Sequence, residues 1–377
     1  MSASAHTIEI RPLRRSYAAL QGSAIYQIRM TRFHKRGQST HLSAACLRSL
    51  VQTGRKGKIM AVNMRKVAIV GCGRSGSAVS FGLMQSGLFS EMVLIDSLAG
   101  RADRVALDLA YGTSFAKPMK IYAGAYEDLA DAGIIILAAG EPMLKTDSRM
   151  EFIRKNVNVL ESIIPEVAKR NTEAIFLVVT NPVDILTYSA LKYIEIPESR
   201  IMGIGTILDT GRVKYLLGKK LSVDPRNVHA FVVGEHGKSE VPIWSSARVS
   251  GVPLRDFFEM RGYQDPDAFL KEVMAEVRAA AGDLSYRRDD TFFGVAMAAR
   301  RVCEAIVRDE KAVLSVSSLM YGAFDIDGIA LSMPAVVGAD GVECLVPVEM
   351  NEDELDEIRK SAATVKSIVD DVLGEAR

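Results

Sequence analysis

Residues 67–96 constrain the fold of this chain more than any other stretch. The aliphatic run 67–70 leads into Gly71-Cys72-Gly73-Arg74-Ser75-Gly76, and a helix-compatible segment follows. A second aliphatic run, 92–95, ends in Asp96, twenty residues after the last glycine of the turn. A strand, a glycine turn, a helix and a second strand in this order predict a βαβ unit of the dinucleotide-binding type.

The glycine turn allows the backbone and a helix N-terminus to approach a pyrophosphate, and Asp96 is placed to accept hydrogen bonds from an adenosine ribose. Glycines also serve plain turns, so the motif alone leaves both interpretations open. The flanking strand and helix and the acid at the right distance favour a bound cofactor. Because Asp96 would repel a 2′-phosphate, we expect NAD rather than NADP.

Length and composition limit what surrounds this unit. A chain of 377 residues exceeds a typical domain, which favours two domains. With 48% hydrophobic and 25% charged residues and no apolar run long enough to span a bilayer, it is typical of a globular protein without a membrane segment. The four cysteines, Cys46, Cys72, Cys303 and Cys344, show no CxxC spacing, which argues against a disulfide framework or a metal site and fits a reducing compartment.

The net charge of +1 averages two unlike parts. Residues 1–60 hold eleven lysines or arginines and one acid, a charge of +10, whereas the remainder holds 36 basic and 45 acidic residues, a charge of −9. The acidic remainder is not typical of a nucleic-acid-binding protein. The first 60 residues resemble a transit peptide in composition, but we favour an over-extended gene start, with Met60 or Met64 as the initiator, and exclude them from the fold.

After Asp96 the chain alternates as a doubly wound α/β sheet does. We expect helices from after Gly76 to Ser86, over 102–111 and over 150–169, with parallel strands over 119–123, 134–139 and 175–180 and near Ile201. A strand over 228–233 precedes helices over 268–288 and 292–308, antiparallel strands over 312–320, 329–337 and 342–348, and a closing helix over 352–373.

Four loops that follow these strands carry chemistry-bearing residues. They are residues 139–149, Thr180-Asn181-Pro182-Val183-Asp184, residues 203–212, and Gly234-Glu235-His236-Gly237. In this order they resemble the L-lactate/malate dehydrogenase family, in its lactate or L-2-hydroxyacid branch, from about Arg65 to the C-terminus. The resemblance implies a Rossmann NAD-binding domain over 65–203 and an α+β substrate domain over 204–377.

Reduction of a 2-oxo acid needs a hydride from the nicotinamide and a proton for the carbonyl oxygen. The resemblance implies that His236 donates the proton and that Asp209 orients His236. It also implies that Arg212 binds the substrate carboxylate and that Arg149, at the end of a mobile loop, polarises the carbonyl. Taken singly, these residues also fit a turn histidine, an i, i+3 surface ion pair and an ordinary arginine in a first helical turn.

The resemblance also implies contacts for the substrate and the cofactor. Asn181, Thr291 and Met143 would meet the substrate. The cofactor would lie against Gly71, Gly73, Arg74, Ser75, Gly76, Asp96, Ala139, Gly140, Thr180 and Asn181.

Three departures from the family pattern indicate a reshaped pocket. Met143 stands where lactate enzymes usually carry glutamine and malate enzymes arginine, and it cannot pair with a second carboxylate. Asp289 and Asp290 replace a small Gly-Ala pair, and Gly282 stands where a larger residue is common. We therefore expect pyruvate or a larger apolar 2-oxo acid as substrate.

The function expected is that of an NAD-dependent L-2-hydroxyacid dehydrogenase, most simply an L-lactate dehydrogenase of glycolysis and carboxylic acid metabolism in the cytoplasm. The alternatives are a malate dehydrogenase, which Met143 disfavours, and a catalytically silent NAD-binding scaffold. The family also implies a homo-oligomer, a dimer or tetramer, with no nucleic acid or membrane partner. Lys214 and His229 match a fructose 1,6-bisphosphate site in activated bacterial members, but they equally fit a helix-surface lysine and a strand histidine.

Overall fold

Aliphatic runs with few polar residues form the six parallel strands at the centre of the structure. They are β1 (Asn63–Val70), β2 (Glu91–Ile95), β3 (Lys120–Ala123), β4 (Ala132–Leu137), β5 (Ile175–Val178) and β6 (Ile201–Gly203). Their order in the sheet, β3-β2-β1-β4-β5-β6, is that of a Rossmann fold. The computed structural model describes residues 62–144, 146–286 and 292–374, and residues 281–286 through their backbone alone.

The same sheet continues into the second half of the chain. Ser317 of β10 (Ala312–Tyr321) pairs antiparallel with Gly203 of β6, and β11 (Asp327–Gly338) and β12 (Gly341–Leu345) extend the sheet to nine strands. A second, antiparallel sheet consists of β7 (Val228–Val233), β8 (Val241–Val249) and β9 (Val252–Pro253). A bridge between Gly234 and Ser332 joins the end of β7 to β11.

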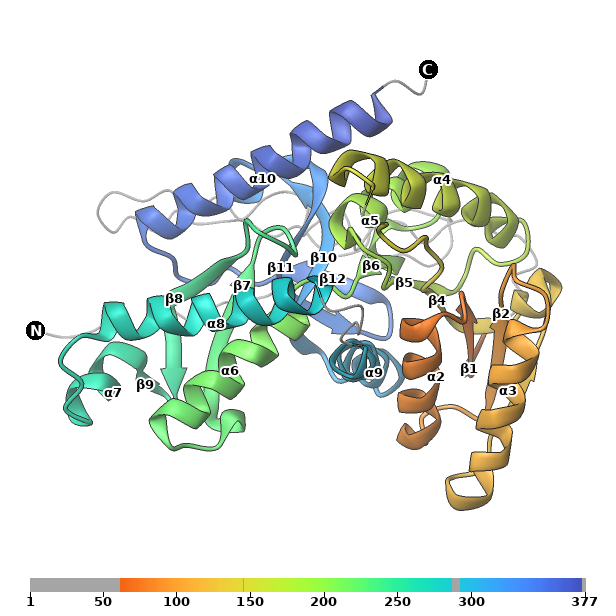
Figure 1. The fold of residues 1–377 in the computed structure, drawn as a ribbon, viewed down its shortest axis with the longest axis horizontal. Helices are drawn as coiled ribbons and strands as arrows, with labels where there is room; N and C mark the ends of the chain where they lie inside the picture. Colours follow the sequence, from red (N-terminus) through yellow and green to blue (C-terminus); the bar gives the residue numbers. More distant parts are fainter. Residues whose placement is uncertain (1–61, 145, 287–291, 375–377) are drawn as a thin grey trace, which may run out of the picture. The chain divides into compact units, whose positions relative to one another are not determined.

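Helices cover both faces of the large sheet and pack on the small one. The α-helices are α2 (Arg74–Ser86), α3 (Arg101–Gly112), α4 (Arg149–Ala168), α5 (Val183–Tyr193), α6 (Ile207–Leu221), α7 (Leu254–Met260), α8 (Pro266–Tyr286), α9 (Phe293–Val307) and α10 (Glu352–Leu373). Of these, α7 packs on β8 and β9, and α8 packs on α6. Figure 1 shows α4 and α5 together on one side and α2 and α9 together on the other, and the same helices contact each other in pairs. Capping boxes, Ser148 with Glu151 and Asn351 with Glu354, start α4 and α10.

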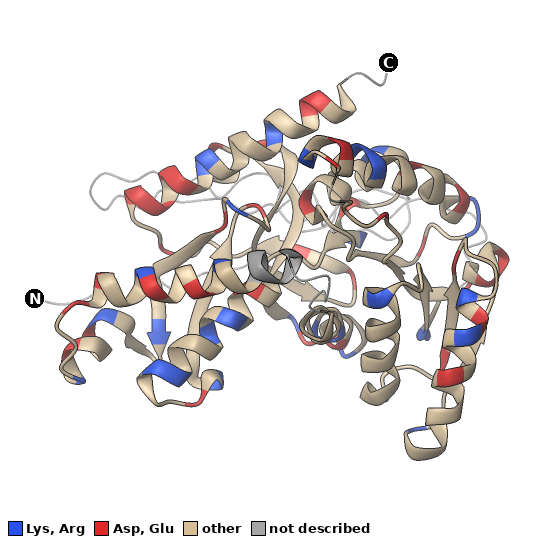
Figure 2. Ribbon diagram, in the orientation of Figure 1, with Lys and Arg blue, Asp and Glu red and all other residues tan. Residues whose placement is uncertain are grey.

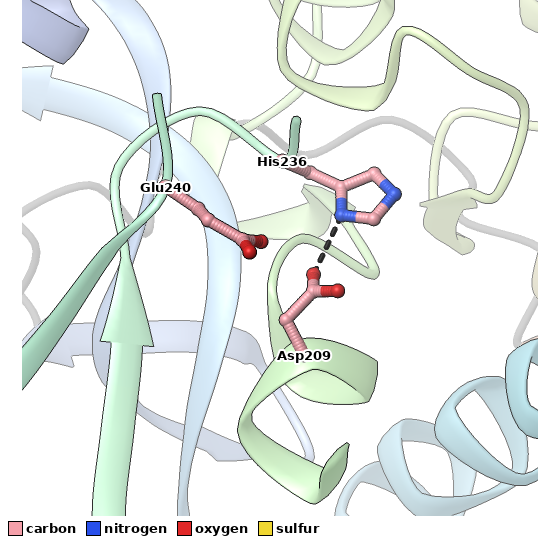
Figure 3. A group of neighbouring side chains, drawn as sticks. All are labelled: Asp209, His236 and Glu240. Atoms are coloured by element: carbon pink, nitrogen blue, oxygen red, sulfur yellow. Dashed lines mark hydrogen bonds and ion pairs between the residues drawn. The ribbon is translucent and has the colours of Figure 1, made fainter. Parts of the chain in front are cut away.

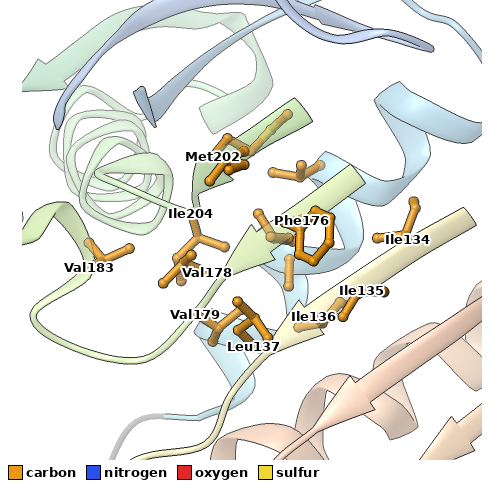
Figure 4. Close-up of a cluster of buried hydrophobic side chains, with 14 of the residues drawn as sticks. Ile134, Ile135, Ile136, Leu137, Phe176, Val178, Val179, Val183, Met202 and Ile204 are labelled. Carbon is orange, nitrogen blue, oxygen red and sulfur yellow. The ribbon is translucent and has the colours of Figure 1, made fainter. Parts of the chain in front are cut away.

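Two hydrophobic cores lie beneath these layers. The larger one surrounds β4 and β5, where Ile135 and Phe176 are fully buried (Figure 4). The smaller one packs Val213 and Leu217 of α6 against Val232 of β7. A few charged residues, among them Asp184, Asp209 and Glu240, are buried. On the surface, Figure 2 shows both signs interspersed along α8 and α10. None of the described helices is long and apolar enough to cross a membrane.

The predicted elements are largely confirmed, with corrections at strand ends. Strands β4 and β5 end two residues earlier than expected, because the N–H groups of Val179 and Thr180 both bond to the Leu137 carbonyl (2.9 and 3.3 Å) and leave the ladder. β12 ends three residues early, at Leu345. Helices α5 and α7 and strands β8 and β9 were not predicted. The apolar residues of α5 show no clear helical stripe, since most of this helix is buried. The first 60 residues and the expected end of α8 at residue 288 lie outside the described residues.

Candidate active site

Three of the four loops singled out in the sequence follow β4, β5 and β6 at the carboxyl edge of the parallel sheet, and the glycine turn and Asp96 follow β1 and β2 at the same edge. The fourth loop follows β7 of the antiparallel sheet, and its His236 meets Asp209, which follows β6 at this edge. In open α/β sheets a ligand binds in the crevice beyond this edge. The fold therefore brings residues from separate parts of the sequence to one place.

The glycine turn after β1 has room for a pyrophosphate. A Cβ on Gly76 would lie 1.8 Å from the Gly71 carbonyl oxygen, and one on Gly71 (φ +101°) would lie 2.3 Å from the Ala139 nitrogen, so both positions need glycine for packing. Gly73 is different, because no atom lies within 4 Å of the Cβ it lacks. Gly73 is the N-cap of α2, and no side chain forms a capping hydrogen bond there, so a ligand could approach the start of the helix.

Asp96 is fixed beside this turn. Its Oδ2 accepts a hydrogen bond from the Cys72 N–H (2.7 Å) and its Oδ1 accepts one from the Leu98 N–H (2.8 Å), while Arg101 Nη1 lies 3.4 Å from Oδ2. Two carboxylate oxygens offer about four acceptor positions, so lone pairs remain for ribose hydroxyls. Burial raises the pKa of the Cys72 thiol to about 12, so it stays protonated within the turn.

His236, Asp209 and Arg212 form one connected group (Figure 3 draws the first two). His236 Nδ1 lies 2.6 Å from Asp209 Oδ2, and Arg212 Nη1 donates to Asp209 Oδ1 at 2.7 Å. The Asp209 side chain is fully buried, whereas the His236 side chain is 21% exposed. Figure 3 shows the other ring nitrogen of His236 pointing away from the carboxyl groups, where a ligand could reach it.

The surrounding charges favour the protonated imidazole. Burial alone would lower the pKa of His236, but the charge and hydrogen bond of Asp209, with smaller contributions from Asp184 and Glu240, raise it to about 9. Burial would raise the pKa of Asp209, yet the neighbouring His236 and Arg212 hold it below its ordinary value. At neutral pH the group therefore contains an imidazolium that can donate the proton of its other ring nitrogen, Nε2, to a substrate.

Backbone contacts hold this pair in register. The Thr206 hydroxyl donates to the Val232 carbonyl (2.5 Å) and the Val232 N–H donates to Thr210 Oγ1 (3.0 Å), so the start of α6 is tied to β7. The His236 N–H donates to Asp184 Oδ2 (2.8 Å), whose other oxygen accepts from the Ser332 hydroxyl (2.8 Å). Elements from three regions of the chain thus position one imidazole.

Arg149, the first residue of α4, reaches the same region from the other half of the sheet. Its guanidinium forms an ion pair with Glu235, which precedes His236 in the chain. The Arg149 side chain is 47% exposed, whereas that of Glu235 is 4% exposed. The Ser239 hydroxyl donates to the other Glu235 oxygen (2.5 Å), so this buried carboxylate is fully partnered.

Glu240 completes a cluster of ionisable groups. One ligand atom from each of Asp209, His236 and Glu240 lies within 4.8 Å of the others. These residue types also bind cations, but Asp209 already has Arg212 and His236 as partners. The cluster therefore fits a proton-handling site better than an additional metal ion. A cavity of about 220 Å³ opens beside Arg212, between α6 and α8.

Two contiguous family matches cover nearly all of the described chain. Residues 65–203 match the NAD binding domain of lactate/malate dehydrogenase, and residues 206–376 match its alpha/beta C-terminal domain. The chain belongs to the lactate/malate dehydrogenase family. The glycine turn and Asp96 therefore belong to the family's NAD-binding domain, in agreement with the open space beside Gly73.

Individual members of the lactate/malate dehydrogenase family support this assignment. An L-lactate dehydrogenase of Acetivibrio thermocellus is 40% identical over 306 residues, which cover 81% of this chain and 96% of that protein. The ligand-bound minor L-lactate dehydrogenase of Enterococcus mundtii is 34% identical with a TM-score of 0.79, covering 82% of this chain and 98% of that one. A malate dehydrogenase of Cryptosporidium parvum is 27% identical with a TM-score of 0.78, covering 84% and 100%. Since both branches superpose equally well, the fold does not separate them.

Most residues predicted for the site lie at the carboxyl edge, but not all take part in one network. Asn181 is exposed and follows the sheet beside Thr180, whose hydroxyl donates to the Ala139 carbonyl (2.8 Å). Met143 is 56% exposed on the loop before α4. Thr291, together with Asp289 and Asp290, lies outside the described residues.

The remaining predicted residues fall into two groups. Arg74 and Ser75 open α2, and Gly140 lies in the loop after β4. Lys214 and His229 are not brought together by any hydrogen bond or ion pair between described residues. His229 is exposed on β7, on the opposite face from Val228 and Ala230, which pack against α6.

Sequence reasoning missed three carboxyl groups of the site: Asp184, Glu235 and Glu240. Asp184 and Glu235 lie inside loops that were quoted for the resemblance, and Glu240 lies three residues after the last of these loops. Their burial was the missing information. An acid directly before an aliphatic strand, as Glu240 is before β8, is the one local signal that could have marked a buried carboxyl.

The two kinds of glycine in the turn can be separated by substitution. We expect Gly76→Ala to lower thermal stability and NADH affinity together, because its Cβ would collide with the Gly71 carbonyl. We expect Gly73→Ala to leave stability nearly unchanged but weaken NADH binding, because its Cβ would enter the open space beside α2. Melting temperature and NADH fluorescence titration measure the two effects. Gly73→Ala with wild-type NADH affinity would show that the pyrophosphate lies elsewhere.

Proposed function

We propose that this chain is an NAD-dependent L-2-hydroxyacid dehydrogenase that interconverts pyruvate, or a larger apolar 2-oxo acid, and the L-2-hydroxy acid. The observation that carries the proposal is the His236–Asp209–Arg212 group, which lies at the same sheet edge as the NAD-binding turn. A silent scaffold would have no need for this group. Relatives that are 40% and 37% identical to this chain are named L-lactate dehydrogenases.

When bound, NADH supplies the hydride for the carbonyl carbon of the oxo acid. His236 gives its outward-facing N–H proton to the carbonyl oxygen, and Asp209 stabilises the imidazolium before transfer and fixes its tautomer. Arg212 binds the substrate carboxylate with its planar guanidinium, which can bond both oxygens at once. Removal of water by the closing loop strengthens each of these interactions.

Arg149 is proposed to polarise the carbonyl from the loop side. Its present partner is Glu235, so its guanidinium already lies next to the residue that precedes the proton donor. Asn181 and Thr291 are proposed to complete the substrate pocket. The cofactor contacts proposed beyond the glycine turn are those of Ala139, Gly140, Thr180 and Asn181 in the adjoining loops.

Met143 favours the lactate branch over the malate branch. On the exposed loop, a thioether offers no charge to a second carboxylate, and it can fill space against an apolar side chain. Burial against it contributes roughly 0.8 kcal/mol per methylene, or about a fourfold gain in kcat/KM per added carbon. Oxaloacetate would leave a carboxylate without a partner there.

An oligomer and an effector site extend the proposal. Large apolar side chains are exposed on helices that contact one another, Phe81 on α2, Leu107 and Tyr111 on α3 and Met297 on α9, which favours a dimer or tetramer. Lys214 is half-buried, and burial lowers its pKa; among the described residues it has no carboxylate partner, so a phosphate could serve as one. The domain division at residue 203, the cytoplasmic location and the glycolytic role stay predictions.

The proton donor can be tested first. We expect His236→Asn to reduce kcat for pyruvate by several orders of magnitude, because asparagine cannot donate a proton to the carbonyl oxygen as an imidazolium does, while the Kd for NADH stays near wild type. Stopped-flow turnover and NADH titration measure the two quantities. Lys238→Asn, on the exposed end of the same turn, is the control and should retain activity. Half of the wild-type activity remaining in His236→Asn would refute the assignment.

Specificity can be tested on two adjacent loop positions. We expect Met143→Arg to shift the ratio of kcat/KM toward oxaloacetate, because it supplies a partner for the second carboxylate. Leu144→Arg places the same charge one residue further on, at a side chain that is similarly exposed, and should leave the ratio unchanged. Initial rates with pyruvate, 2-oxobutyrate and oxaloacetate decide. Equal shifts in both variants, or none, would show that Met143 is not the specificity contact.

The effector site has its own test. We expect fructose 1,6-bisphosphate to lower the apparent KM for pyruvate in the wild type and not in Lys214→Gln, with Lys219→Gln, an exposed lysine on the same helix, as the control. Sedimentation velocity should show an oligomer, and runs with and without the sugar bisphosphate test whether the effector changes its size. An unchanged KM together with an unchanged oligomer size would mean that the site is absent.

A further inference from the structure

Glu240 is a buried carboxyl that the proposed reaction does not use. The residue is 2% exposed, and its Oε1 has no hydrogen-bond partner in the described part of the chain. Its backbone carbonyl accepts a bond from Arg278 Nη2 (3.2 Å), which fixes the main chain but leaves the carboxyl free. Figure 3 shows that carboxyl pointing toward Asp209 and His236. An unsatisfied buried oxygen is costly for folding. We therefore expect the contribution of Glu240 to lie in its electrostatic effect on the charged groups around it.

The described charges around Glu240 come from four elements. Asp209 and Arg212 face it from α6, Arg278 from α8 and His236 from the turn after β7, while Asp184 of α5 acts on the same imidazole. Burial and then the charge of Asp209 raise the pKa of Glu240 to about 7, against the opposing effect of the three cations. A Glu240 carboxylate in turn favours the protonated form of His236. The two titrations are therefore linked.

We propose that Glu240 is a positioning residue for the proton of His236, whose carboxylate keeps the imidazole protonated at alkaline pH. It acts through His236 and touches neither substrate nor cofactor. The inference rests on the proposed function, because it concerns the proton that His236 donates. The alternative is a residue that only fills space beside β8.

The pH profile of kcat/KM separates these roles. For reduction of the oxo acid, kcat/KM falls as the free enzyme loses the His236 proton, so the alkaline limb reports that ionisation. Glu240→Gln keeps the shape and removes the charge. We expect the limb to move down by about one pH unit, since a charge at this distance in a partly shielded site has an effect of that order.

Two further variants sharpen the comparison. Glu240→Asp keeps the charge and should retain most of the wild-type limb. Glu276→Gln removes a glutamate charge from α8, where it pairs with Lys220 (2.7 Å), and should leave the limb unmoved. The Kd for NADH should stay within about twofold of wild type in all three, because the cofactor turn follows β1, whereas Glu240 lies before β8 of the other sheet and Glu276 lies on α8.

Stability gives an independent reading. The pKa of Glu240 is raised from 4.5 to about 7 in the folded protein, so the folded state holds this proton more tightly than the unfolded state. Its contribution to stability is therefore lost as the pH rises from about 4.5 to about 7. We expect the melting temperature of Glu240→Gln to rise relative to wild type over this window, and Glu276→Gln to show no such change.

The outcomes are distinct. A lowered limb in Glu240→Gln with NADH binding intact supports the inference, and a limb that coincides with wild type overturns it, whatever happens to kcat. If Glu240→Gln does not fold, Glu240→Leu, which also removes the charge, takes its place: a lowered limb supports the inference and a wild-type limb overturns it. Activity retained in His236→Asn would overturn the proposed function itself. An inactive His236→Asn with an unmoved Glu240→Gln limb would overturn only the role of Glu240.

Discussion

The hydrogen bond between His236 and Asp209 is the interaction on which the arrangement of the second half of the chain depends. Its two partners lie on different elements, so the 2.6 Å distance requires α6 and the end of β7 to be held in register. Thr206 ties the start of α6 to β7, and Asp184 of α5 holds the His236 backbone while it accepts from Ser332 of β11. The large sheet therefore has to continue through β10 and β11 for the imidazole to be positioned.

The electrostatics of the site follow from how much acid is buried around one histidine. Asp184, Asp209 and Glu240 are all nearly inaccessible, and burial raises the pKa of Asp184 despite its bonds to His236 N and Ser332. Buried charges are costly unless they are paired, and here His236 and Arg212 are the partners. The buried carboxylates lower the stability of the folded protein, but they keep His236 protonated at neutral pH. They also hold the Arg212 guanidinium where a carboxylate substrate would bind.

Local patterns predicted the parts of the structure that are local. The glycine turn, Asp96 and the strands around them form a contiguous unit. The bounds of α10 were predicted to the residue, because residues close together in the sequence form its capping box and its apolar stripe. The candidate site was predicted through its resemblance to a family. What no local pattern contained was the continuation of the sheet from β6 to β10 and the burial of Glu235, which depend on distant segments.

Arg149 shows how the two halves of the chain meet chemically. Glu235 is 4% exposed in its side chain, and its backbone N–H donates to Ser361 on α10 (2.8 Å), so the carboxylate cannot move to follow a loop. If Arg149 left it entirely, a buried charge would keep only the Ser239 hydroxyl as a partner, which is strongly unfavourable. A guanidinium has five N–H donors in a fixed fork. Arg149 can therefore polarise a substrate carbonyl most readily by sharing its guanidinium between the carbonyl and Glu235, which would place the polarising charge beside the proton donor.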